Sequence, residues 1–128
     1  MTKRAFVLDD EEDMTILTGE LLRKSGFEVV TSNNPATGLE LLRKTDFDVI
    51  VMDLMMPRLG GLEVLRALRS SGRHSKTPIV VFSAKRLEDE ERKLIMDYGV
   101  RFISKPLAPK NLVAVILESS AQTGDTLR

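Results

Sequence analysis

The sequence contains no cysteine and no tryptophan, and it has a single tyrosine among its 128 residues. Without cysteine the chain has no disulfide framework, no thiolate metal site and no cysteine nucleophile. With so few aromatic residues, a surface that stacks nucleic-acid bases is not expected. Lysine plus arginine and aspartate plus glutamate are equal at 19 each, and the resulting net charge of zero argues against direct nucleic-acid binding.

Long hydrophobic runs are also absent. The longest runs, such as residues 49–52 and 112–117, are far shorter than the roughly 20 residues that a membrane-spanning helix needs. The N-terminus has only a short apolar stretch before a run of acids, which does not fit a signal peptide. We therefore expect a cytoplasmic protein that has no membrane partner.

Short apolar runs alternate with segments of helical spacing. We expect strands at residues 5–8, 27–30, 49–52, 79–82 and 100–103. Between them, apolar residues recur at intervals of three and four, which predicts helices around Leu17, Leu42 and Leu65 and at 86–98 and 109–119. Strands joined by helical crossovers run parallel, so the pattern predicts a single-domain, doubly wound α/β sandwich with five βα units.

Helix boundaries and the C-terminus give further expectations. Asn34 before Pro35 predicts an N-cap with proline at the first helical position. The domain is expected to span residues 4–119, and residues 120–128 to form a polar tail or the start of a linker. His74 lies in a polar segment, so we expect it to be exposed and to have no functional role.

Acidic and polar residues directly follow the predicted strands. Asp9 and Asp10 come after the first strand, Asp53 after the third, Ser83 after the fourth and Lys105 after the fifth. In an open parallel sheet, ligands bind beyond the carboxyl ends of the strands. We therefore expect three carboxylates, a hydroxyl and an ammonium group to lie together at one edge of the sheet.

Three carboxylates in one place repel each other. Two like charges ~4 Å apart cost about 4 kcal/mol at an effective dielectric constant of ~20, and the single ammonium of Lys105 cannot neutralise three acids. Ligands that offer only oxygen favour a hard cation, so we predict bound Mg²⁺, or Mn²⁺ in its place. Mg²⁺ also binds phosphate oxygens, which indicates phosphoryl chemistry with Asp53, on the central strand, as the candidate nucleophile.

Four short motifs resemble the receiver domain of two-component response regulators, in the order that the family has. They are Val7-Leu8-Asp9-Asp10, Asp53-Leu54-Met55-Met56-Pro57, Phe82-Ser83-Ala84 and Lys105-Pro106. Their spacing along the chain also suits the family. The resemblance covers residues 4 to about 119, and it implies a flavodoxin-like fold whose parallel strands have the order 2-1-3-4-5.

The resemblance also implies a role for each matching residue. Asp53 accepts a phosphoryl group from a histidine kinase or a histidine phosphotransfer protein, and Lys105 and Ser83 complete the catalytic group. Lys105 pairs first with Asp53 and later with the phosphate, while Ser83 forms a hydrogen bond to a phosphoryl oxygen. Ser83 and Phe102 are the switch residues, and Phe102 turns inward on activation. The peptide bond before Pro106 is often cis in this family.

The metal ligands follow from the same resemblance. Asp10 and Asp53 bind Mg²⁺ directly, together with the backbone carbonyl of Met55, and Asp9 acts largely through metal-bound water. The expected product is an aspartyl phosphate that carries a signal. We therefore expect a signalling phosphoacceptor and not an enzyme that turns over small substrates.

The implied partners use two surfaces. Phosphorylation is expected to change the face formed by the fourth helix, the fifth strand and the fifth helix, which an effector protein or a fused output domain reads. The same face is a candidate homodimer interface. Met14 and Leu17 on the first helix are expected to contact the kinase. A stand-alone regulator and a receiver cut from a larger protein fit the sequence equally.

Three other functions can be compared with this interpretation. A phosphatase of the haloacid-dehalogenase type would have a second aspartate two residues after the nucleophile, where this chain has Met55. A flavodoxin would have a phosphate-binding loop after the first strand, where this chain has Asp-Asp-Glu-Glu-Asp. A receiver-like docking domain that is never phosphorylated would have lost residues of the acidic site, and this sequence retains them all.

Overall fold

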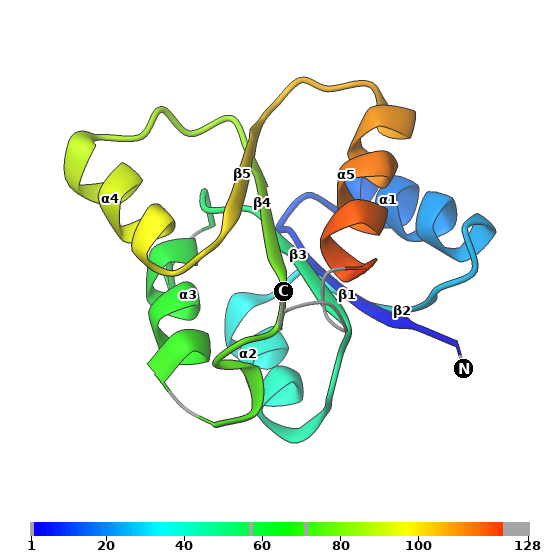
Figure 1. Cartoon of the computed structure of the whole chain (residues 1–128), viewed down its shortest axis with the longest axis horizontal. Helices are drawn as coiled ribbons and strands as arrows, with labels where there is room; N and C mark the ends of the chain where they lie inside the picture. The colour runs from blue at the N-terminus through cyan, green and yellow to red at the C-terminus, as the bar shows by residue number, and fades with distance from the viewer. Residues whose placement is uncertain (1, 57, 71, 122–128) are drawn as a thin grey trace.

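Five parallel strands form the central sheet, in the order β2-β1-β3-β4-β5 (Figure 1). The computed structural model describes residues 2–56, 58–70 and 72–121. The strands are β1 (Arg4–Leu8), β2 (Glu28–Ser32), β3 (Val49–Met52), β4 (Ile79–Ser83) and β5 (Arg101–Ser104). This order and the parallel pairing confirm the doubly wound sandwich that the sequence predicts.

Helices cover both faces of the sheet (Figure 1). They are α1 (Glu12–Lys24), α2 (Pro35–Lys44), α3 (Gly61–Ser70), the short 3₁₀ helix η1 (Gly72–His74), α4 (Asp89–Asp97) and α5 (Pro109–Ala121). Side chains of α1 and α5 share one core cluster with the strands, and those of α2, α3 and α4 share the other. Among the described residues, no helix has the length and apolarity that crossing a lipid bilayer requires.

Alternation along the buried strands supplies both cores. Successive side chains of a strand point to opposite faces of the sheet. In β1, Phe6 and Leu8 pack with α2 and α3, whereas Ala5 and Val7 pack with α1 and α5. All four residues of β3 are buried, because this strand lies at the centre and helices cover it on both sides.

The strands begin and end within two residues of the positions predicted from the sequence. The fourth helix begins later than predicted, and the fifth helix ends later than predicted. The fourth helix starts at Asp89 because Glu88 and Glu91 form a capping box there. The fifth helix continues to Ala121, so Ser120, at the start of the predicted tail, is a buried residue of the helix. Residues 122–128, which complete the predicted tail, lie outside the described residues.

The start of α2 agrees with the sequence, whereas His74 does not. Asn34 caps α2 by accepting hydrogen bonds from the backbone N–H groups of Ala36 and Thr37, as expected. The expectation that His74 is exposed is wrong, because the side chain is 2% exposed. Its ring reaches backbone carbonyls at the end of α2 that no helical N–H can satisfy.

Candidate functional site

Strand pairing brings the two buried acids together. Leu8 of β1 and Met52 of β3 are register partners, and Asp9 and Asp53 are the residues that follow them. The backbone N–H of Asp53 donates a hydrogen bond to the carbonyl of Leu8 at 3.0 Å. One carboxylate oxygen from each of Asp9, Asp10 and Asp53 lies within 4.8 Å of the other two. The structure therefore gathers the three acids as the sequence predicts.

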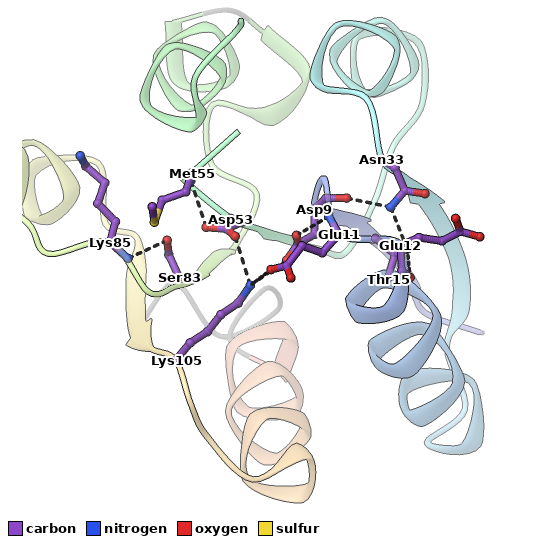
Figure 2. Close-up of polar contacts among 10 residues, drawn as sticks. All are labelled: Asp9, Glu11, Glu12, Thr15, Asn33, Asp53, Met55, Ser83, Lys85 and Lys105. Atoms are coloured by element: carbon purple, nitrogen blue, oxygen red, sulfur yellow. Dashed lines mark hydrogen bonds and ion pairs between the residues drawn. The ribbon is translucent and has the colours of Figure 1, made fainter. Parts of the chain in front are cut away.

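Lys105 lies between the two buried carboxylates (Figure 2). Its Nζ is 3.0 Å from Oδ2 of Asp9 and 3.1 Å from Oδ2 of Asp53. It is also 3.6 Å from Oε1 of Glu11, whose side chain is 67% exposed. A single ammonium therefore faces three acidic side chains, and it reaches the deepest two by hydrogen bonds.

The crowding affects the pKa values of the paired groups. Burial raises the pKa of Asp9 above its ordinary value, although a backbone N–H from Glu11 and the ammonium of Lys105 oppose this; the charge of Asp53 raises it further. Burial acts to lower the pKa of Lys105, but its hydrogen bonds and charge interactions with Asp9 and Asp53 outweigh this and raise it. Lys105 therefore stays an ammonium group beside the two acids.

Backbone N–H groups fix the orientation of both buried carboxylates. Met55 donates its N–H to Oδ1 of Asp53 at 3.0 Å, and Glu11 donates its N–H to Oδ1 of Asp9 at 3.0 Å. Because Lys105 binds the other oxygen of each acid, each carboxylate has partners on both sides. The Met55 side chain itself is exposed, so this residue contributes through its backbone.

Sequence reasoning missed Asn33 as a supporting residue. Its Nδ2 donates to the backbone carbonyl of Asp9 at 2.8 Å and to Oγ1 of Thr15 at 3.0 Å, which ties the end of β2 to the start of α1 (Figure 2). The adjacent Asn34 could be recognised because it caps the helix that begins beside it. Asn33 instead contacts Asp9, which lies 24 residues earlier, and no pattern near Asn33 indicates this contact.

The predicted switch residues lie on β4 and β5, the two strands on one side of β3. Ser83, at the end of β4, is completely buried, and its Oγ accepts a hydrogen bond from the N–H of Lys85 at 3.2 Å. Phe102 of β5 is partly buried and packs against the core cluster on the α2, α3 and α4 side. The peptide bond between Lys105 and Pro106 is cis. Pro57, from the second motif, lies outside the described residues.

An apolar groove of about 190 Å³ begins beside Lys105 and runs along α1. Met14 and Leu17, predicted to contact the kinase, both line it. The other lining residues are Thr18, Leu21, Phe82, Lys105, Pro106, Leu107 and Leu112. The two α1 residues therefore lie on a concave surface that reaches the acidic site.

The acid cluster fits a magnesium ion by its chemistry. Its three members offer carboxylate oxygens and no nitrogen or sulfur ligand, which suits a hard cation. Three negative side chains also exceed the one positive charge of Lys105. Asp9, Asp10 and Asp53 are therefore the residues that could hold the ion.

Comparison with known proteins decides the family. A family model described as "Response regulator receiver domain" matches residues 5–117. The chain belongs to this family. Receivers act as signalling phosphoacceptors in two-component phosphorelays rather than as enzymes on small substrates, and they bind Mg²⁺ at an acidic aspartate cluster. The assignment decides against the haloacid-dehalogenase and flavodoxin alternatives.

Relatives of this receiver include both kinases and transcriptional regulators. Hybrid signal transduction histidine kinase D of Dictyostelium discoideum is 35% identical over 111 residues, which cover 87% of this chain and 7% of that protein. Alkaline phosphatase synthesis transcriptional regulatory protein PhoP of Bacillus subtilis is 32% identical over 115 residues, covering 89% of this chain and 47% of that protein. The chain thus spans less than half the length of these relatives.

The fold also matches a solved receiver structure. The receiver domain of sensor histidine kinase PA1611 from Pseudomonas aeruginosa has a TM-score of 0.81 at 19% identity, covering 94% of this chain and 99% of that one. That crystal structure contains a magnesium ion coordinated in its active site cleft. At this level of identity the match supports the fold alone.

Proposed function

We propose that Asp53 of this receiver accepts a phosphoryl group from a phosphohistidine of a histidine kinase or a histidine phosphotransfer protein. The observation that carries the proposal is the environment of its carboxylate. Asp53 directly follows the central strand, Lys105 donates a hydrogen bond to its Oδ2, and the backbone N–H of Met55 donates one to its Oδ1. The carboxylate is thus held at a fixed angle at the edge of the sheet where ligands bind.

In the proposed transfer, a carboxylate oxygen of Asp53 forms a bond to phosphorus as the bond from phosphorus to the donor imidazole nitrogen breaks. The imidazole keeps the electron pair and takes up a proton from water. Lys105, freed from one acid, balances negative charge on the phosphoryl oxygens, and Ser83 donates its hydroxyl to one of them. The product is an aspartyl phosphate.

The acids and the backbone of Met55 have a second role in this proposal. Asp10 and Asp53, with the backbone carbonyl of Met55, would hold Mg²⁺ or Mn²⁺, and Asp9 would act through water bound to the ion. When bound, the ion supplies positive charge that offsets the repulsion between the acids and the incoming phosphoryl group. The cluster formed by Asp9, Asp10 and Asp53, which offers only carboxylate oxygens, supports a hard cation at this place.

The signal is proposed to leave the site through Ser83 and Phe102. An aspartyl phosphate carries more negative charge than aspartate and adds acceptor oxygens. Ser83 turns toward one of these oxygens and gives up the hydrogen bond from Lys85, and Phe102 then turns inward. This changes the α4-β5-α5 face, where we place the contact with an effector protein or a fused output domain and the interface of a homodimer.

Measurement of intact mass tests the acceptor. After incubation with acetyl phosphate and Mg²⁺, the wild type is expected to gain one phosphoryl group and Asp53→Asn to gain none, because the amide is not a nucleophile. Asp46→Asn, which changes an exposed acid, is expected to be labelled like the wild type. Chelation of Mg²⁺ should suppress labelling.

Two outcomes would contradict the proposal. Labelling that persists in Asp53→Asn would place the acceptor elsewhere. A wild type that remains unlabelled by acetyl phosphate and by phosphorylated kinases would support the docking domain that is never phosphorylated.

A further inference from the structure

The aromatic ring of Phe82 lies beside the ammonium group of Lys105. Phe82 belongs to β4 and immediately precedes Ser83, and it is 5% exposed. The centroid of its ring is 5.3 Å from Nζ of Lys105. An ammonium within about 6 Å of an aromatic ring is attracted by the negative face of the ring. Lys105 therefore has a fourth partner in addition to the three acids.

The contact with Phe82 attracts the ammonium of Lys105 in a different direction from the ion pair with Glu11. Lysine has a long flexible stem, and its ammonium can bind several acids in turn. The exposed Glu11 lies 3.6 Å away and draws the ammonium toward solvent. The buried Phe82 attracts the same group from within the core. Because the Lys105 side chain is only 14% exposed, water weakens this attraction little.

The apolar groove adds to this restraint. The ring of Phe82 and the side chain of Lys105 both line it, together with Leu112 of α5. Phe82 and Leu112 also belong to the same core cluster, so packing fixes the position of the ring. A rigid ring beside a flexible stem can set the position of the ammonium without contacting the reacting atoms.

We propose that Phe82 is a positioning residue that holds the ammonium of Lys105 between Asp9 and Asp53, ready for the phosphoryl group. The inference rests on the proposed phosphorylation of Asp53. An aliphatic residue at this position would fill the same space but would not attract the ammonium. Lys105 would then spend more time near Glu11 and less time at the acceptor.

Nuclear magnetic resonance tests the contact without any phosphorylation. Protons near the face of an aromatic ring resonate at unusually high field, so the Hε protons of Lys105 report the ring directly. Phe82→Met and Phe82→Leu are expected to shift these resonances to ordinary lysine positions, and Phe82→Tyr to preserve them. Phe27→Leu is the matched control, because Phe27 is 6% exposed and lies in the same core cluster but has no cation contact in the described structure.

The rate of phosphorylation by acetyl phosphate and Mg²⁺ tests the consequence. This small donor does not need the groove, so the rate reports the acidic site. Phe82→Met and Phe82→Leu are expected to slow the reaction about five- to thirtyfold, the range between an exposed and a fully desolvated cation–ring contact. Phe82→Tyr should restore most of the rate. Phe27→Leu should lower the thermal unfolding temperature but leave the rate within experimental error.

The outcomes separate this inference from the proposed function. Unchanged Lys105 resonances in both non-aromatic variants, or rates equal to that of the wild type, would overturn the role of Phe82. Equal slowing by Phe27→Leu would also overturn it, because general loosening of the core would then explain the effect. If the wild type itself is never phosphorylated, the proposed function fails, and the resonances still decide whether the ring holds the ammonium.

Discussion

His74 ties the end of α2 to the segment that precedes β4. Its Nε2 lies 2.7 Å from the carbonyl of Leu42 and 2.9 Å from that of Thr45, and its Nδ1 lies 3.0 Å from Oγ1 of Thr77. Carbonyl oxygens only accept hydrogen bonds, so Nε2 carries a proton and donates it. The ring also stacks on Phe47. A single side chain thus satisfies several buried polar groups.

Replacing His74 is expected to destabilise the fold. His74→Ala leaves the carbonyls of Leu42 and Thr45 without this partner and opens a cavity, so the free energy of unfolding should fall by about 2–3 kcal/mol. Urea denaturation measures this. Lys76→Ala, an exposed position two residues away, should change the value by less than about 0.5 kcal/mol. A loss below about 1 kcal/mol for His74→Ala would contradict the account.

The burial of His74 could not be predicted from the residues around it in the sequence. Its neighbours Arg73, Ser75 and Lys76 are exposed, so the local pattern predicts a surface loop. Its partners lie about 30 residues earlier in the chain, at the end of another helix. The acids were predictable because each directly follows a recognisable strand, whereas His74 is placed by a contact between two connections.

At the scale of elements, α3 begins against the backbone of the proposed acceptor. The N–H of Gly61 donates to the carbonyl of Leu54 at 3.2 Å. A Cβ atom at position 61 would lie 2.4 Å from Cα of Leu54 and 2.6 Å from the carbonyl oxygen of Asp53. Backbone atoms cannot turn aside as a flexible side chain can. Glycine at this position therefore allows the helix to approach the end of β3.

Adjacent glycines give a sharp test of this contact. Gly61→Ala is expected to displace α3 from the Asp53–Leu54 backbone, lowering the free energy of unfolding by about 2 kcal/mol and slowing phosphorylation of Asp53. In Gly60→Ala the new Cβ would meet only Oε1 of Glu63, at 3.7 Å, so stability should change by less than about 0.5 kcal/mol. Thermal unfolding and the acetyl phosphate assay measure both. Similar losses in the two variants would contradict the close-approach argument.

The order of the elements could be predicted because its signals are local, whereas the order of the strands in the sheet came from the resemblance to receiver domains. The β3 and β4 runs are continuously apolar, and Asn34 with Pro35 marks a helix start. The contact of Phe82 with Lys105 could not be predicted, because β4 and the end of β5 are about 20 residues apart and phenylalanine in a buried strand indicates only core packing.

At the scale of the whole molecule, the groove and the proposed output face share α5, but the groove extends toward α1 whereas the output face extends toward α4. The groove lies between α1 and the segment that leads from β5 into α5, and it reaches Lys105. The output face is proposed on α4, β5 and α5. A donor protein seated on the groove would therefore leave α4 accessible, so receiving the phosphoryl group and reading it out can involve different partners.

Substitution of Met14 tests the groove as the docking site. Met14→Glu places a charge on an apolar surface, so phosphotransfer from a kinase or a phosphotransfer protein should slow at least tenfold through weaker docking. Phosphorylation by acetyl phosphate, which needs no docking surface, should remain near the wild-type rate. Glu20→Gln, an exposed change on α1 outside the groove lining, should alter neither rate. Equal slowing with both donors would argue against docking at Met14.

The pairing of Leu8 with Met52 has a consequence for how this protein can vary over evolution. Backbone hydrogen bonds between β1 and β3 set the separation of Asp9 and Asp53, so side-chain volume in the interior does not define it. Interior residues can therefore be exchanged for others of similar size while the two acids keep their spacing. A shift of β1 along β3 by a single position would instead separate the acids and exchange the β1 side chains that face the two cores. Selection for a stable interior thus preserves the acidic site as well.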